Sequence, residues 1–277
     1  MSRDILEQPP TPADSRIAYG ADANQFGDLR LPAQVHVPQG TPETGTVPLV
    51  VVIHGGFWRD TYSLDHIGHL CAALTAHGFA TWSLEYCRLG QRGGGWPGTF
   101  QDVAAGLDQV RALVARYPLD LNRVITIGHS AGGHLALWLV ARHRLPATSP
   151  LWSPNPLPVR GAISLAGVVD LQRAWELRLG RGVVDTLMAG SPAAWPERYA
   201  AASPIELLPL GVPQALLHGT LDDIVPLEIS QRYVAAAKCL GDPAELIVLE
   251  GQGHFEPIDP RSAAWPAVVD AVRQLSE

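Results

Sequence analysis

A glycine-flanked serine at a strand-to-helix junction constrains this chain more than any other feature. Residues 128–132 (GHSAG) follow the apolar run 124–127 and lead into a helix-like run over 131–142. A serine at the tip of such a sharp turn holds its hydroxyl clear of the sheet, and the crowded turn needs small residues two positions before and after it. The pattern predicts an α/β fold in which Ser130 is a nucleophile rather than an ordinary helix-capping serine.

Composition narrows the class of protein. The 277 residues, 47% of them apolar, suit one α/β domain with small insertions. Asp and Glu outnumber Lys and Arg by 27 to 20, and no basic run could follow a phosphate backbone, so we expect no nucleic-acid partner. The apolar runs are strand-sized and residues 1–20 are polar, which predicts a cytoplasmic protein with no membrane span. Cys71, Cys87 and Cys239 are odd in number and widely spaced, as expected of reduced thiols.

Strand-like and helix-like segments alternate along the chain, which predicts a mostly parallel sheet covered by helices on both faces. Strands are expected at 47–53, 79–86, 123–127, 159–165, 214–217 and 245–249. Helices are expected at 64–77, 99–117, 131–142, 227–240 and 263–275. Residues 17–19 and 31–37 are expected to form antiparallel edge strands, although Pro32 weakens the second of them.

Two stretches break this alternation. Residues 170–208 mix tryptophan and tyrosine with glycines and prolines between two predicted strands, and they predict a small helical cap inserted into a single domain over 1–277. Residues 146–158 contain five prolines in thirteen positions, so we expect a surface loop or a pocket rim there.

The remaining groups for serine chemistry follow later strands. Acyl transfer by serine needs a base near the hydroxyl and a carboxylate that holds that base in one tautomer. Asp222 and Asp223 follow the strand expected at 214–217, and His254 follows the last expected strand in a loop loosened by glycine. The residues therefore predict Ser130 as nucleophile, His254 as base and one of the two aspartates as the acid. This order along the chain is that of α/β-hydrolases.

Four motifs together resemble the α/β-hydrolases, and within them the serine esterases of the hormone-sensitive-lipase-like and kynurenine-formamidase-like group. The motifs are HGGFW at 54–58, GHSAGGH at 128–134, HGTLD at 218–222 and GH at 253–254. The resemblance runs from about residue 47 to the end, and it implies an α/β-hydrolase fold with a catalytic triad of Ser130, Asp222 and His254. It further implies an oxyanion hole made by the backbone N–H groups of Gly55, Gly56, Phe57 and Ala131.

The residues and the resemblance predict a carboxylesterase that cleaves small, largely apolar carboxylic esters through an acyl-enzyme, with no cofactor and no metal. Phe57 stands where hormone-sensitive-lipase-like esterases have a third glycine, and this departure is closer to the kynurenine-formamidase pattern. An arylformamidase acting on an N-formyl aromatic amine is therefore the alternative. A small-peptide hydrolase, a lipase and a non-catalytic binding module on the same fold are less favoured. The expected partner is a small-molecule ester or amide, and both a monomer and a homodimer stay open.

Other residues carry weaker signals. Four tryptophans on predicted loops or in the cap are candidates to line an apolar pocket: Trp58, Trp96, Trp152 and Trp175. Residues 93–98 (GGGWPG) fit a dinucleotide-binding fingerprint in form, but the proline interrupts the turn and a rim loop is favoured. His66 and His69, with Asp65 beside them, could be imagined as a metal site, but two histidines without a third clear ligand are weak evidence for a metal. His129 and His134 are expected to be packed or surface histidines, and His54 to hydrogen-bond its own loop.

Overall fold

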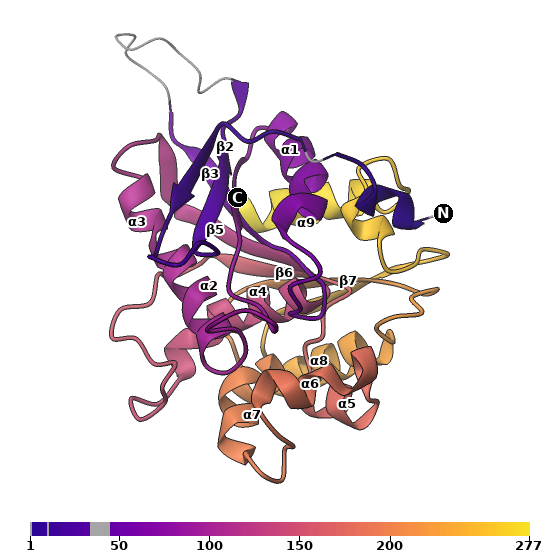
Figure 1. The fold of residues 1–277 in the computed structure, drawn as a ribbon. Helices are drawn as coiled ribbons and strands as arrows, with labels where there is room; N and C mark the ends of the chain where they lie inside the picture. The colour runs from indigo at the N-terminus through magenta and orange to yellow at the C-terminus, as the bar shows by residue number, and fades with distance from the viewer. Residues whose placement is uncertain (1, 10, 34–44) are drawn as a thin grey trace.

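An eight-stranded sheet organises the protein (Figure 1). The computed structural model describes residues 2–9, 11–33 and 45–277. The strands are β1 (Ser15–Ala18), β2 (Phe26–Arg30), β3 (Val47–Ile53), β4 (Ala80–Leu84), β5 (Leu119–His129), β6 (Gly161–Leu165), β7 (Gln214–Gly219) and β8 (Ala244–Leu249). Their order is β1-β2-β4-β3-β5-β6-β7-β8, antiparallel at β1/β2 and β2/β4 and parallel elsewhere. The predicted α/β-hydrolase architecture, with its mostly parallel sheet, is confirmed.

Helices cover both faces of the sheet. They are α1 (Gly68–Ala76), α2 (Gly98–Asp108), α3 (Val110–Leu113), α4 (Ala131–Ala141), α5 (Leu171–Glu176), α6 (Leu179–Met188), α7 (Pro196–Ala202), α8 (Glu228–Cys239) and α9 (Trp265–Ser276). Alternate residues of β3 face the two layers of helices. Val51 and Ile53 pack in one core cluster with α2, α4 and α8. Val50 and Val52 pack in the other with α1 and α9. Both faces of the central strands are thus buried, as their continuous apolar sequences require.

The edge of the sheet departs from the sequence prediction. The second edge strand was expected at 31–37, but β2 lies at Phe26–Arg30, and residues 34–37 lie outside the described residues. Gly27 explains this placement, because a Cβ at that position would lie 2.4 Å from the Trp82 ring of β4. Only glycine lets β2 pair so closely with β4, and Asp28 then pairs across to Arg16 of β1 at 2.8 Å.

Three helices, α5 to α7, lie between β6 and β7, where a cap was predicted over 170–208, and they gather beside α8 in Figure 1. Two buried side chains of α4 hold the end of α7. Trp138 Nε1 donates to the carbonyl oxygen of Ala201, and His134 Nε2 donates to that of Ala202, each at 2.9 Å. Since α4 follows Ser130 directly, this segment is tied to the helix behind the candidate nucleophile. Its role as the cap of a single domain stays a prediction.

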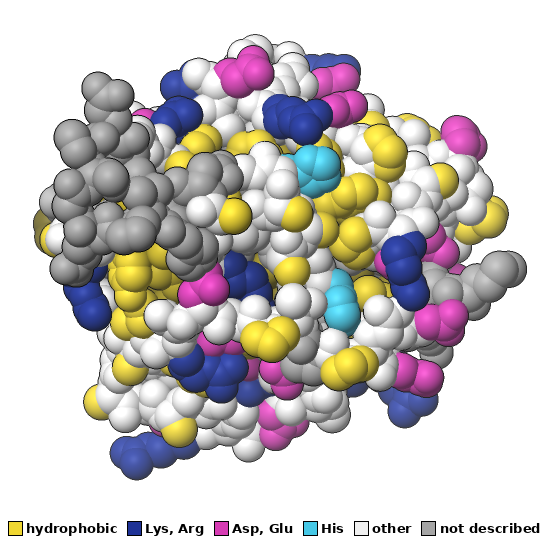
Figure 2. Space-filling view, turned by 90° about the horizontal axis from the view of Figure 1, so that it is seen from above, with side chains coloured by type: hydrophobic (Ala, Val, Ile, Leu, Met, Phe, Trp, Pro, Cys, Tyr) yellow, Lys and Arg dark blue, Asp and Glu magenta, His cyan; other side chains and the backbone are white. Residues whose placement is uncertain are grey.

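The surface carries charges of both signs. On the face shown in Figure 2, Lys and Arg side chains are interspersed with Asp and Glu side chains. Across the described residues, every helix is too short or too polar to cross a lipid bilayer. Cys71 and Cys87 are buried and Cys239 is exposed, and all three are free thiols.

Candidate active site

The serine turn between β5 and α4 is strained and tightly packed. Ser130 has φ 56° and ψ −118°, a conformation that residues with a side chain rarely adopt. A Cβ on Gly128 would lie 2.0 Å from the carbonyl oxygen of Gly132, and a Cβ on Gly132 would lie 2.1 Å from that of Ile53. The Ser130 N–H donates to the Leu165 carbonyl oxygen of β6 at 2.8 Å. The glycines at 128 and 132 are therefore required by the contacts of the turn itself.

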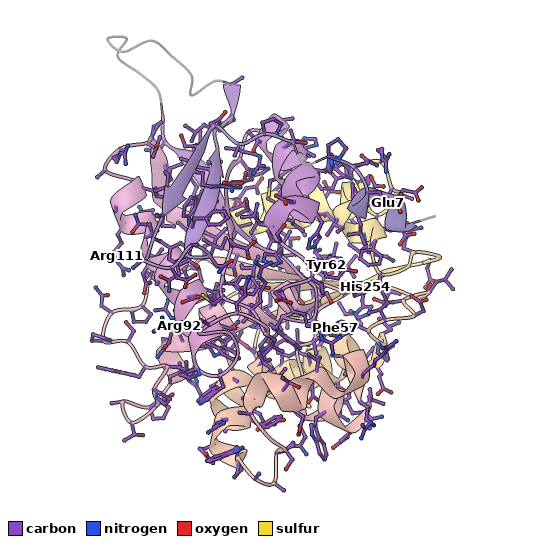
Figure 3. The ribbon with its side chains drawn as sticks, viewed as in Figure 1. Glu7, Phe57, Tyr62, Arg92, Arg111 and His254 are labelled. Atoms are coloured by element: carbon purple, nitrogen blue, oxygen red, sulfur yellow. The ribbon has the colours of Figure 1, made fainter. Side chains whose placement is uncertain are left out.

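Ser130 lines a cavity of about 80 Å³ that is built from segments far apart in the sequence. Its lining residues are Leu6, Gly56, Phe57, Tyr62, His66, His129, Ser130, Ile224, His254 and Phe255. Phe57 and Tyr62 come from the loop after β3 and His254 from the loop after β8, and the three residues, labelled in Figure 3, lie close together. For comparison, an enclosed apolar cavity of about 150 Å³ binds benzene, so this smaller, partly open cavity encloses a group of only a few heavy atoms.

His254 and Asp222 form a buried hydrogen-bonded pair beside this cavity. His254 Nδ1 lies 2.7 Å from Asp222 Oδ2. The other oxygen, Oδ1, accepts the N–H groups of Ile224 and Val225 at 2.9 and 2.8 Å. Because an ionised carboxylate only accepts, Nδ1 of His254 must donate, and Nε2 is left with a free lone pair. His254 can therefore accept a proton from a group in the cavity.

The surroundings of Asp222 keep it ionised. Burial by itself raises the pKa of Asp222, but hydrogen bonds from His218, His254 and Val225 outweigh burial and hold that pKa well below its ordinary value. Asp223 is exposed and makes no hydrogen bond or ion pair within the described residues. Of the two aspartates that the sequence offered, Asp222 is the one that contacts His254.

The loop after β3 brings unpaired N–H groups to the cavity. Gly56 has φ 106° and Phe57 has φ 53°, and both residues line the cavity. Within the described residues, the N–H groups of Gly56, Phe57 and Ala131 donate to no protein acceptor. Ala131 is the first residue of α4, where the first turn leaves N–H groups unpaired and the helix dipole is positive. Gly55 lies against the serine turn, because a Cβ there would be 2.8 Å from the His129 carbonyl oxygen.

A buried ion cluster fixes this loop. His54 Nδ1 donates to the Gly55 carbonyl oxygen at 2.8 Å, and Nε2 donates to Glu85 Oε1 at 2.9 Å, so the imidazole carries both protons. Arg88 Nε lies 3.2 Å from the same carboxylate. Burial raises the pKa of Glu85, but the charge of His54 and its hydrogen bond, with the charge of Arg88, bring that pKa below its ordinary value. Tyr86 stacks on His54 with 4.4 Å between ring centroids and donates to the His54 carbonyl oxygen.

We expect Glu85→Gln to lower the free energy of unfolding by about 3 kcal/mol, because it leaves two buried cations without their carboxylate. Urea denaturation of the purified variant measures this change. Glu176→Gln is the matched control, since Glu176 pairs with Arg173 on the exposed surface, where an ion pair contributes little. Equal stability of the two variants would show that the buried cluster does not hold the loop.

His129 contacts both the backbone and the ring of His254. Its Nε2 donates to the His254 carbonyl oxygen at 2.9 Å, and the two ring centroids are 4.6 Å apart. Burial, with repulsion from His254 and His66, holds the pKa of His129 well below its ordinary value. His129 is therefore a neutral packed residue that fixes the backbone of its neighbour, which extends the packing role expected from the sequence.

The four tryptophans proposed for the pocket do not line this cavity. Trp58 is buried in the core, where its ring meets that of His134 edge-to-face at 5.3 Å. Trp96 packs on Phe100 of α2, and Trp175 donates to Asp185 within the segment between β6 and β7. Trp152 is exposed on the proline-rich loop. These tryptophans are therefore not part of the cavity beside Ser130, and Trp175 lines a different pocket.

The suggested metal ligands lie apart. His66 lines the cavity, whereas His69 Nδ1 contacts the Thr11 hydroxyl at 3.3 Å. Over the described ranges, no three His, Cys, Asp or Glu side chains converge as a metal site requires. The glycine-rich residues 93–98 lead into α2, which begins at Gly98.

Sequence reasoning missed several residues of the site. Leu6, Tyr62, Ile224 and Phe255 line the cavity although no motif marks them. Glu85 could have been found, because it directly follows β4 at the edge of the sheet where parallel strands present functional groups.

The chain is similar in sequence to a known protein family and to several esterases. Residues 34–236 match the family model described as BD-FAE. The chain is 26% identical over 254 residues to a probable isoprenylcysteine alpha-carbonyl methylesterase, ICMEL1, of Oryza sativa subsp. japonica, with 87% of this chain and 56% of the relative covered. It is 26% identical over 260 residues to esterase LipC of Mycobacterium tuberculosis, with 88% and 60% covered. The chain spans about half the length of the curated relatives it matches.

Solved structures share the fold. A truncated carbohydrate esterase from gut microbiota superposes with a TM-score of 0.80 at 20% identity, covering 97% of this chain and 99% of the other. A thermophilic esterase of Thermogutta terrifontis, Est2 with propionate bound, gives a TM-score of 0.74 at 22% identity, with 95% and 93% covered.

Proposed function

The chain belongs to the BD-FAE family, and from this membership and the cavity beside Ser130 we propose that it is a serine carboxylesterase acting on esters of short acyl groups. The observation that carries the proposal is the 2.7 Å contact between His254 and Asp222, with the free Nε2 of His254 and the Ser130 hydroxyl at one cavity. The names of the relatives and structural neighbours, which include a methylesterase and two esterases, support ester hydrolysis.

The proposed reaction has two halves. Ser130 Oγ attacks the ester carbonyl while His254 Nε2 takes its proton, and the oxyanion is held by N–H groups of Gly56, Phe57 and Ala131. His254 then returns the proton to the departing alcohol, which leaves an acyl group on Ser130. Water then attacks the acyl carbonyl while His254 Nε2 takes one of its protons, and His254 returns that proton to Ser130 Oγ as the Ser130–acyl bond breaks and the acid leaves. Asp222 keeps His254 in the productive tautomer and stabilises its charged form.

The size of the cavity supports a short acyl group. Its volume is about 80 Å³, and Leu6, Ile224 and Phe255 form apolar walls. Each buried methylene contributes about 0.8 kcal/mol to binding where space exists, whereas overpacking costs about 1–3 kcal/mol. Acyl chains of two or three carbons therefore gain contact here, and longer chains either collide with the walls or extend out of the cavity without further contact.

We expect kcat/KM to fall at least tenfold from p-nitrophenyl acetate to p-nitrophenyl octanoate, since the longer chain exceeds the cavity. Initial rates over a series of chain lengths measure this. N-formylkynurenine belongs in the same series, and we expect it to react at least about a hundredfold more slowly than the acetate. A rising preference for long chains would contradict the short-acyl proposal, and efficient deformylation would identify an arylformamidase instead.

A further inference from the structure

His66 is a buried histidine at the cavity that the proposed mechanism does not use. Its side chain is only 9% exposed, and it lies at the end of the short turn (Leu64–Ile67) before α1. Nδ1 is 2.8 Å from the Ser63 carbonyl oxygen. Because a carbonyl oxygen only accepts, Nδ1 carries the proton and Nε2 carries a lone pair.

That lone pair has no partner in the described part of the protein. Nε2 of His66 makes no hydrogen bond within the described residues, yet it is not enclosed, unlike the unpaired Nδ1 atoms of His129 and His134. The cavity beside Ser130 is the one that His66 lines. Nε2 is therefore an acceptor open to a molecule that occupies this cavity.

The surroundings keep His66 neutral and oriented. Burial, with the charge of nearby His54, lowers the pKa of His66 to about 3. The ring lies edge-on to Tyr62 and His54, each at 5.8 Å between centroids, and 6.5 Å from the ring of His129. A neutral ring with one fixed tautomer offers an acceptor and no donor at this position. A buried polar group of this kind favours ligands that supply the missing partner.

We propose that His66 Nε2 accepts a hydrogen bond from a hydroxyl group of the substrate next to the scissile ester, so that the preferred substrates are short-acyl esters with a free neighbouring hydroxyl. The proposal rests on the carboxylesterase function above. It adds a polar requirement to a cavity whose other walls are largely apolar.

Matched esters test the proposal. 2-Hydroxyethyl acetate and 2-methoxyethyl acetate differ only by a methyl on the oxygen of the alcohol part, and methyl lactate and methyl 2-methoxypropanoate differ in the same way on the acyl part. We expect the wild type to prefer the hydroxyl member of one pair at least about tenfold in kcat/KM, because a mismatched buried acceptor loses its partner. The pair that shows the preference identifies the side of the ester that His66 contacts. No preference in either pair would overturn the proposal.

His66→Phe keeps a ring of similar shape and removes the acceptor, so we expect the preferred ratio to fall to about one. His77→Phe, the same substitution at an exposed histidine outside the cavity, should leave the ratio unchanged. p-Nitrophenyl acetate, which has no hydroxyl, separates this proposal from the first. If His66→Phe still hydrolyses it and also keeps the wild-type ratio, His66 has only a structural role. If the wild type fails to hydrolyse it and every other ester, the proposed function itself is wrong.

Discussion

Replacing Ser130 with alanine should lower kcat/KM on p-nitrophenyl acetate by about 10⁵-fold or more without unfolding the protein. Alanine keeps the Cβ of serine, so the strained backbone at φ 56° gains no new clash, and only the nucleophilic oxygen is lost. The residual rate would come from the oxyanion N–H groups acting on water. Steady-state kinetics measure the loss, and thermal unfolding monitored by circular dichroism confirms that the fold persists.

Ser164→Ala is the matched control for this variant. Ser164 is a buried serine on β6, the strand beside β5, and its hydroxyl makes no hydrogen bond in the described residues. Removing an unpaired buried hydroxyl should leave stability and activity close to wild type. Near-wild-type turnover by Ser130→Ala would exclude the acyl-enzyme mechanism.

Asp222→Asn should lower kcat by about 10⁴-fold, because it reverses the tautomer of the base. An asparagine can turn its NH₂ group toward Nδ1 of His254, which places the proton on Nε2. His254 then offers a donor to Ser130 where the reaction needs an acceptor. A burst-phase measurement with p-nitrophenyl acetate would show whether acylation is the step that slows.

Asp223→Asn provides the control one residue away. Asp223 is exposed, whereas the Asp222 carboxyl is buried against His254 at 2.7 Å. We expect the exposed substitution to change kcat by less than about twofold. Equal losses in the two variants would contradict the assignment of Asp222.

The sequence predicted the parts of the fold that follow from local pattern. The continuous apolar run at 47–53 became β3 with the same bounds, and the junction at GHSAG became the turn between β5 and α4. Both follow from steric rules that act within a few residues. The approach of Asp222 to His254 was expected from the order of motifs, and the geometry supports it.

The remainder depended on contacts between distant residues. The position of β2 is set by Gly27 against Trp82, which no local pattern reveals. Trp58 stands in a loop yet is fully buried, and its burial depends on distant residues such as His134, which its ring contacts edge-to-face. The sequence marks His66 only as a weak candidate metal ligand. Its role as a hydrogen-bond acceptor depends on its contact with the Ser63 carbonyl oxygen and on the cavity that it lines, neither of which a local pattern reveals.

The residues that line the cavity also have a consequence for folding to the active state. Leu6 from the turn at Ser2–Leu6 and Phe255 from the loop after the last strand line the same small cavity as Ser130. Closing contacts over such sequence separations is slow, because the chain entropy is lost before the contacts form. Helical signal can therefore recover while the cavity still lacks a wall. Recovery of turnover on a small ester during refolding would therefore report when the segments that carry Leu6 and Phe255 have both docked.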